Sequence, residues 1–280
     1  MTLVQNLGLQ YTRTKFALLS RISKKEAAQK AFELFITPQS RVKIDLPPLF
    51  QNAEKLQFSF EGNSIHGFRF NYPSKKKAII LHGFESSIIN FEKYINPLLK
   101  KGYEVLAFDA PGHGVSSGKR INAIDYKNFI LHIIKTYGPV TSFITHSYGG
   151  LALSLALEEI PHDESWKVVF MAPATESTTA MNNFFGHLKL DNQVRKEFDL
   201  LITKANNKPP EWYSIARVAE AIKAQVLFLQ DKNDTLTPLS DVAPIMAKGY
   251  PNFTFIISEG LGHSRIYRDE DTINSVIRFL

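Results

Sequence analysis

The sequence contains no cysteine. Disulfide bonds and thiolate metal ligands are therefore excluded, and this absence is compatible with a cytoplasmic location. Long apolar runs are also missing, since no stretch approaches the roughly 18 continuous apolar residues of a membrane span. Near the N-terminus, Arg13 and Lys15 precede a short apolar run, Phe16 to Leu19. We expect a cytoplasmic protein that is neither secreted nor stably inserted in a membrane.

Metal-binding patterns are absent too. No two histidines have the spacing of a zinc motif, and no cysteine is present to complete one. We therefore expect neither a metal nor another cofactor. The histidines without any suggestive spacing are His66, His132, His162 and His187. For His82, His113 and His146, packing or support of a neighbouring loop is favoured over proton transfer.

The formal net charge is +6, and most of the excess lies near the N-terminus. Residues 1–50 contain eight basic residues and three acidic ones. The basic residues are Arg13, Lys15, Arg21, Lys24, Lys25, Lys30, Arg41 and Lys43. Such a segment could contact anionic lipid or nucleic acid, but no base-reading fold follows it. A solvated basic face is the favoured interpretation, and we expect no nucleic-acid partner.

Strand-like and helix-like segments alternate through most of the chain. The predicted strands are 56–60, 65–72, 78–81, 104–108, 140–145, 168–172, 225–230 and 253–257, and the predicted helices are 91–101, 123–137, 148–160 and a final segment ending at 280. The first two strands are predicted to pair antiparallel across residues 61–64. The alternation that follows is typical of an α/β fold, with a mostly parallel sheet and helices on both faces.

One short segment indicates a nucleophile. An apolar run ends at Ser147, and a helix-forming sequence begins at Tyr148. A sharp turn from strand to helix exposes a serine hydroxyl above a sheet. The turn favours small residues two positions before and after the serine. Gly149 meets this requirement, whereas Thr145 stands where the usual pattern has glycine.

Two later segments supply an acid and a histidine in the order that such a serine requires. The predicted strand 225–230 leads into a polar turn that contains Asp231 and Asp234. The predicted strand 253–257 leads to His263, which precedes the final helix. We take Asp234 as the acid that orients the histidine, with Asp231 as the alternative. A serine followed by an acid and then a histidine predicts nucleophilic catalysis.

Together these motifs resemble those of serine hydrolases in the α/β-hydrolase superfamily, including its esterases and lipases. The resemblance extends from about Leu56 to the C-terminus. Residues 78–84, Ala-Ile-Ile-Leu-His-Gly-Phe, are similar to the family's strand that ends in His-Gly-X. Residues 109–116, Asp-Ala-Pro-Gly-His-Gly-Val-Ser, are similar to the loop that follows the next parallel strand. The resemblance implies an oxyanion hole formed by the backbone N–H groups of Phe84 and Tyr148.

The alternation breaks between Pro173 and Gln225, at the position where α/β hydrolases carry a cap. We predict a hydrolase core over 53–174 and 225–280, a helical cap or lid over 175–224, and an N-terminal helical extension and linker over 1–52. Apolar cap residues over the serine would bind an apolar acyl or alcohol group. Phe84, Tyr148, Phe184, Phe185 and Leu188 are the candidate substrate-binding residues, although the cap residues could instead form only the cap's own core.

The N-terminal extension has a helix of its own. Ser23 and Glu26 have the spacing of a capping box. Apolar residues then recur at helical spacing through Phe35, until Thr37 and Pro38 end the pattern. We expect this helix to pack on the core, with the mouth of the site or a dimer contact as alternatives. A monomer and a homodimer both remain open.

The predicted function is hydrolysis of a carboxylic ester of a small to medium apolar substrate through an acyl-enzyme. It depends on Ser147 as nucleophile, His263 as base and Asp234 as the carboxylate that orients the base. A thioesterase, an acyltransferase, an amidase and a carbon–carbon bond hydrolase could use the same residues. A binding protein without turnover is the alternative from another class, and Thr145 is the residue that keeps it open.

Overall fold

The computed structural model describes residues 3–41 and 45–280 and divides the chain into two compact units. The helical unit consists of Met1–Thr37 and Glu176–Tyr213, and the sheet unit consists of Pro38–Thr175 and Ser214–Leu280. Residues 42–44 lie outside the described residues. They include Lys43 and belong to the linker part of the predicted extension 1–52. Within the described ranges, the structure has no helix that is both long enough and apolar enough to span a membrane.

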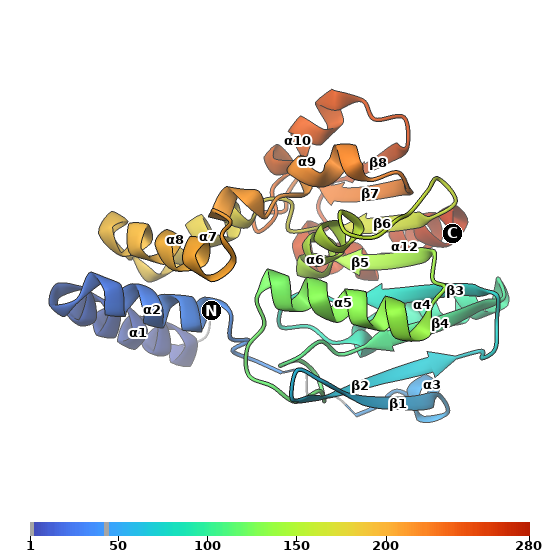
Figure 1. Ribbon diagram of the computed structural model, residues 1–280, viewed down its shortest axis with the longest axis horizontal. Helices are drawn as coiled ribbons and strands as arrows, with labels where there is room; N and C mark the ends of the chain where they lie inside the picture. The colour runs from blue at the N-terminus through green and yellow to red at the C-terminus, as the bar shows by residue number, and fades with distance from the viewer. Residues whose placement is uncertain (1–2, 42–44) are drawn as a thin grey trace. The chain divides into compact units, whose positions relative to one another are not determined.

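The sheet unit is built on one sheet of eight strands in the order β1-β2-β4-β3-β5-β6-β7-β8 (Figure 1). The strands are β1 (Glu54–Phe60), β2 (Asn63–Phe70), β3 (Lys76–Leu81), β4 (Tyr103–Phe108), β5 (Ser142–His146), β6 (Lys167–Met171), β7 (Gln225–Asp231) and β8 (Phe253–Ser258). β2 pairs antiparallel with β1 and with β4, and all other pairs are parallel. The predicted mostly parallel α/β fold is confirmed.

Helices cover both faces of this sheet (Figure 1). The principal ones are α4 (Glu92–Lys100), α5 (Ala123–Tyr137), α6 (Tyr148–Leu157), α10 (Leu239–Lys248) and α12 (Glu270–Phe279), with the short helices α3 (Pro48–Gln51), α9 (Ile215–Val218) and α11 (Gly262–Arg265). α4 and α12 share one core cluster with Ile80, Val105 and Ile144. α5 and α6 pack together on the opposite face. Strands buried on both sides explain the nearly continuous apolar runs of the sequence.

Local signals placed several elements correctly. The predicted helix 123–137 matches α5, and the structure adds a cap at its start, where the side chain of Asn122 accepts hydrogen bonds from the N–H groups of Ile124 and Asp125. Asp125 completes the capping box by accepting from the N–H of Asn122. A cap of this kind fixes the first turn of a helix from sequence alone.

The helical unit contains α1 (Leu3–Ile22), α2 (Lys24–Phe35), α7 (Ser177–Leu188) and α8 (Asn192–Asn206). Ser23 accepts from the N–H of Glu26, so the predicted start of α2 is confirmed. The apolar stripe of α2 packs on α8, with the rings of Phe32 and Phe198 5.7 Å apart. Packing on the hydrolase core was the expected arrangement for α2. The structure instead pairs it with a helix about 160 residues later, which sequence periodicity cannot identify.

The two units differ from the predicted domain ranges. The N-terminal helices and residues 176–213 form one unit, whereas we predicted an extension and a separate cap. Residues 214–224 lie in the sheet unit, not in a cap that ends at 224. They are held there because the N–H of Ile215 donates to the carbonyl of Thr175, and Arg217 forms two hydrogen bonds with the carboxylate of Glu158. That residues 176–213 cover the serine stays a prediction.

Asp109, at the end of β4, connects the loops at the carboxyl edge of the sheet. Its carboxylate accepts from the N–H groups of Ile88 and Val115, and its carbonyl accepts from the hydroxyl of Ser116. A Cβ on Gly114 would lie 2.0 Å from that carboxylate, and Gly114 has a φ of 46°. Glycine is therefore required at 114, as the predicted loop motif implies.

We expect Asp109→Asn to lower the free energy of unfolding by about 1–3 kcal/mol, because an amide NH₂ would face a backbone N–H that now has an acceptor. Urea unfolding monitored by circular dichroism measures the change. Asp45→Asn, at an exposed carboxylate, is the matched control and should leave the midpoint unchanged. Equal stability of the two variants would contradict the structural role of Asp109.

Candidate active site

Ser147 lies at a strained turn between β5 and α6. Its backbone has a φ of 53° and a ψ of −120°, a conformation that costs a non-glycine residue about 1–3 kcal/mol. Hydrogen bonds satisfy its backbone: its N–H donates to the carbonyl of Met171, and its own carbonyl accepts from the N–H groups of Gly150 and Ala174. The surrounding strands therefore hold the turn in place, as in the nucleophile elbow predicted from the sequence.

Close packing around the turn explains both its glycines and its threonine. A Cβ on Gly149 would lie 2.8 Å from the carbonyl oxygens of Leu81, the last residue of β3, and of His82, which follows it, so a residue without a side chain is needed here. The hydroxyl of Thr145 donates to the carbonyl of Val169 at 2.8 Å, so the threonine bonds β5 to β6. Gly150 provides the space that the Thr145 side chain occupies, because a Cβ on residue 150 would lie 3.2 Å from Oγ1 of Thr145.

The structure brings three of the predicted residues into one chain of hydrogen bonds. Nε2 of His263 lies 3.0 Å from Oγ of Ser147, and Nδ1 of His263 lies 2.8 Å from Oδ2 of Asp234. The Asp234 side chain is fully buried, whereas that of His263 is 15% exposed. These side chains come from the ends of β5, β7 and β8, which are parallel strands and therefore end at the same edge of the sheet.

Asp234 is held as an ionised carboxylate. Burial opposes ionisation, but hydrogen bonds from His263 and Thr237 and the nearby charge of His263 outweigh it and lower the pKa of Asp234. The hydroxyl of Thr237 donates to Oδ2 at 2.7 Å, and the N–H groups of Leu236 and Thr237 donate to Oδ1. Sequence reasoning treated Thr237 only as part of a turn. The spacing of an aspartate and a threonine three residues later was the available signal for this contact.

Asp231, the alternative acid, has a different set of partners. Oδ2 accepts from the hydroxyl of Ser258 at 2.7 Å and from the N–H of Leu261 at 3.0 Å. Oδ1 accepts from the N–H of Asn233. Burial opposes ionisation, yet these hydrogen bonds and one from the N–H of Gly262 lower the pKa of Asp231. Asp231 thus anchors the loop that leads to His263 and forms no hydrogen bond with the imidazole among its described contacts.

Phe84 and Tyr148 both lie near Ser147: Tyr148 follows it in the chain, and Phe84 follows Gly83. Gly83 packs directly against the serine, since a Cβ at 83 would lie 2.9 Å from the Cβ of Ser147. The rings of Phe84 and Tyr148 are 5.7 Å apart in an edge-to-face arrangement, and both side chains are partly exposed. The two residues therefore border the serine, and the role of their N–H groups as oxyanion donors stays a prediction.

Three buried histidines support the loops around the site. Nδ1 of His82 donates to the carbonyl of Gly83, while its Nε2 accepts from the N–H of Ala110. Nε2 of His146 donates to the carbonyl of His263, and Nδ1 of His113 donates to the carbonyl of Pro111. Burial lowers the pKa of His82 to about 4 and the pKa values of His113 and His146 to about 3. All three are therefore neutral near pH 7.

The candidate substrate residues of the helical unit contribute to its interior. Phe185 is 6% exposed and Leu188 is 5% exposed. The ring of Phe185 lies 5.0 Å from that of Phe198, and the ring of Phe184 lies 5.2 Å from that of Phe35. Packing within the unit thus accounts for these contacts, and substrate binding by Phe184, Phe185 and Leu188 stays a prediction.

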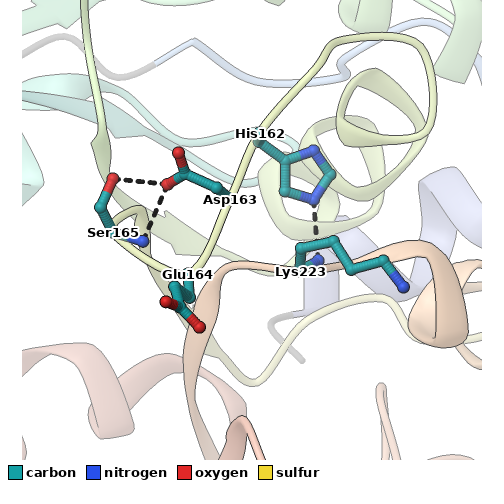
Figure 2. Close-up of a pocket in the computed structure, with 5 residues that line it drawn as sticks. All are labelled: His162, Asp163, Glu164, Ser165 and Lys223. Carbon is teal, nitrogen blue, oxygen red and sulfur yellow. Dashed lines mark hydrogen bonds between the residues drawn. The ribbon is translucent and has the colours of Figure 1, made fainter.

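A pocket of about 470 Å³ lies at the amino ends of the parallel strands, opposite the end that carries Ser147 (Figure 2). His162, Asp163, Glu164 and Ser165 precede β6, and Lys223 precedes β7, so these residues lie at the amino ends of strands whose carboxyl ends carry the site. Nε2 of His162 accepts from the N–H of Lys223, and Asp163 accepts from Ser165. This pocket is therefore separate from Ser147.

The buried histidines generate a pH prediction. Their folded pKa values lie below the ordinary value of 6.5, so the unfolded chain binds more protons between about pH 6.5 and 4. Stability is then complete above pH 6.5 and falls as the pH drops through this window, by up to about 1.4 kcal/mol per pH unit for each histidine. Urea unfolding at several pH values between 7.5 and 5 measures this slope.

His113→Asn can keep the donor to Pro111 but removes one titrating group, so the slope should decrease by about one third. His187→Asn changes an exposed imidazole and should leave the slope unchanged. If the substitution also lowers the free energy of unfolding by the same amount at every pH, the slope of that free energy against pH does not change. A slope that does not differ between His113→Asn and the unmutated protein would contradict the assignment of His113 as a neutral buried group.

Comparisons with known proteins agree with this architecture. An esterase of Pyrococcus furiosus superposes with a TM-score of 0.64 at 22% identity, over 88% of this chain and 97% of that one, a likeness of fold. The chain is 31% identical to an uncharacterized hydrolase of Bacillus subtilis over 37% of its own length and 39% of that protein's. It is 23% identical to putative esterase/lipase 2 of Mycoplasma pneumoniae, over 73% of this chain and 88% of that protein.

The family model described as serine aminopeptidase, S33, matches residues 72–228. Since this match covers more than half of the chain, the protein belongs to the S33 serine aminopeptidase family of α/β hydrolases.

Proposed function

We propose that this α/β hydrolase cleaves carboxylic esters of small to medium apolar substrates through a covalent acyl-enzyme on Ser147. The observation that carries the proposal is the continuous chain of hydrogen bonds from Ser147 through His263 to Asp234, at 3.0 Å and 2.8 Å. A serine hydroxyl becomes an effective nucleophile only with a base within hydrogen-bond reach. His263 meets that distance requirement, and Asp234 orients it.

In the first half of the reaction, Oγ of Ser147 attacks the acyl carbon while its proton moves to Nε2 of His263. The positive charge that develops on the imidazole is stabilised by the Asp234 carboxylate, which stays ionised. His263 then donates the same proton to the alkoxide as the ester C–O bond breaks. The alcohol leaves, and the acyl group remains bonded to Ser147.

In the second half, water takes the place of the alcohol. His263 removes a proton from water, the hydroxide attacks the acyl carbon, and the proton then passes to Oγ of Ser147 as the acid leaves. In both tetrahedral intermediates the carbonyl oxygen carries negative charge. The N–H groups of Phe84 and Tyr148 are the proposed donors to that oxygen, and Tyr148 lies at the positive end of α6.

The aromatic rings beside the serine support an apolar substrate. Phe84 and Tyr148 border Ser147 and are only partly buried, so their faces are available to an acyl or alcohol group. The pairing of an apolar surface with few polar groups is usual for small-molecule sites. The esterase of Pyrococcus furiosus and the putative esterase/lipase of Mycoplasma pneumoniae among the similar proteins also support an ester as substrate.

A series of p-nitrophenyl esters from acetate to palmitate tests the proposal. We expect hydrolysis with an optimum in chain length, and we expect Ser147→Ala to lower kcat by about 10⁴-fold or more. Ser154→Ala is the matched control, since Ser154 lies in α6 and its hydroxyl donates only to the carbonyl of Leu151 among the described contacts. Activity that survives Ser147→Ala would place the nucleophile elsewhere. An alanine p-nitroanilide and an acyl thioester, assayed in parallel, identify a peptidase or a thioesterase.

Substitutions of Asp234 and Asp231 should have different effects, because Asp234 is the proposed catalytic acid and Asp231 holds a loop. Asp234→Asn should lower kcat by about 10⁴-fold, because an amide cannot stabilise the imidazolium of His263. Asp231→Asn should mainly lower the thermal midpoint, because it disrupts hydrogen bonds with Ser258 and Leu261. Steady-state kinetics and thermal unfolding of both variants measure the contrast. The reverse pattern would assign the acid to Asp231.

A further inference from the structure

The helix α1 carries a row of exposed apolar side chains. Leu7 is 62% exposed, Tyr11 72%, Leu18 56% and Ile22 80%. At about 100° per residue these four positions fall within an arc of roughly 60° on one side of the helix. Phe16 and Ser20, by contrast, are buried and lie on roughly the opposite side. α1 therefore packs on its own unit with one face and presents the α1 stripe, Leu7, Tyr11, Leu18 and Ile22, with the other.

Basic side chains border the α1 stripe, and acidic ones are absent from this part of the chain. Residues 1–25 contain no aspartate or glutamate, and their basic residues are Arg13, Lys15, Arg21, Lys24 and Lys25. Arg21 lies about 40° to one side of the stripe and Lys15 about 20° to the other, and both are exposed. Lys24 pairs with Asp191, and Arg13 donates to the carbonyl of His187, so Lys15 and Arg21 supply the charge beside the stripe.

This charge decides between the possible occupants of the stripe. A second copy of the chain would bring two basic segments together, which opposes association. An anionic lipid surface, in contrast, attracts the basic border and accepts the apolar row. Tyr11 suits such a boundary, because its ring is apolar and its hydroxyl is polar.

We infer that α1 binds the surface of anionic lipid bilayers, with the α1 stripe at the level of the headgroups and with Lys15 and Arg21 against lipid phosphates. The stripe extends over about 22 Å of helix, from Leu7 to Ile22. An amphipathic helix whose apolar stripe has a basic border lies in the plane of the interface and does not cross the bilayer. This binding is independent of the proposed reaction, because it uses no residue of the site.

Flotation of the full chain with vesicles tests the inference. We expect binding to vesicles of phosphatidylcholine with about one third phosphatidylglycerol, little binding to phosphatidylcholine alone, and weakening as salt rises from ~0.1 to ~0.5 M. Lys15→Gln with Arg21→Gln should lower partitioning by about fivefold for each charge removed. Lys55→Gln with Lys75→Gln removes the same charge from exposed positions of the sheet unit and should have little effect.

The apolar contribution has its own matched pair. Leu18→Gln should weaken partitioning by about tenfold, whereas Leu200→Gln, at a leucine that is 61% exposed on α8, should not. Circular dichroism verifies the fold of each variant. Ser147→Ala should bind vesicles like the unmutated chain, so failure of the reaction and failure of lipid binding are distinguishable. No binding to anionic vesicles, or equal losses in Leu18→Gln and Leu200→Gln, would overturn the inference. So would a dimer in sedimentation velocity that Leu18→Gln dissociates.

Discussion

Backbone hydrogen bonds hold Ser147 in a left-handed conformation, and the site is arranged around that one residue. The carbonyl of Met171 and the N–H of Ala174 bind its backbone, so the end of β6 fixes a turn that follows β5. The same turn brings Gly149 against the backbone of β3, where no Cβ fits. Three adjacent parallel strands therefore determine the direction of one hydroxyl. The strain at Ser147 persists because the sheet constrains it from both sides.

Neutral histidines form the next layer of this arrangement. His82, His113 and His146 each donate one ring N–H to a backbone carbonyl, in the loop after β3, in the loop after β4 and at His263. A lysine or arginine could donate such bonds only by adding positive charge next to the His263 and Asp234 pair. An uncharged imidazole positions the loops and leaves Asp234 as the ionised partner of His263. Burial, which lowers the pKa values of these three histidines, is thus part of how the site is organised.

Sequence reasoning succeeded where a signal was local or where topology required a meeting point. The cap at Ser23 located the start of α2, and strands that run parallel brought Ser147, Asp234 and His263 to one edge. It failed where a contact joined distant segments. The place of Thr145 depends on the carbonyl of Val169 in the next strand, and the partner of α2 is α8. Neither contact can be predicted from the periodicity of the sequence. A hydroxyl can donate to many different carbonyls, and an apolar helix face can pack on many different apolar surfaces.

The helical unit is assembled from the beginning and the later part of the chain, Met1–Thr37 and Glu176–Tyr213. This order has a consequence for biosynthesis. A ribosome that has made α2 must add about 170 further residues before α8 is complete, at a rate of about 5–20 residues per second. Throughout that interval Phe32 and Phe35 lack the aromatic partners that they have in the folded protein. The first helices to be synthesised are therefore among the last to reach their native packing.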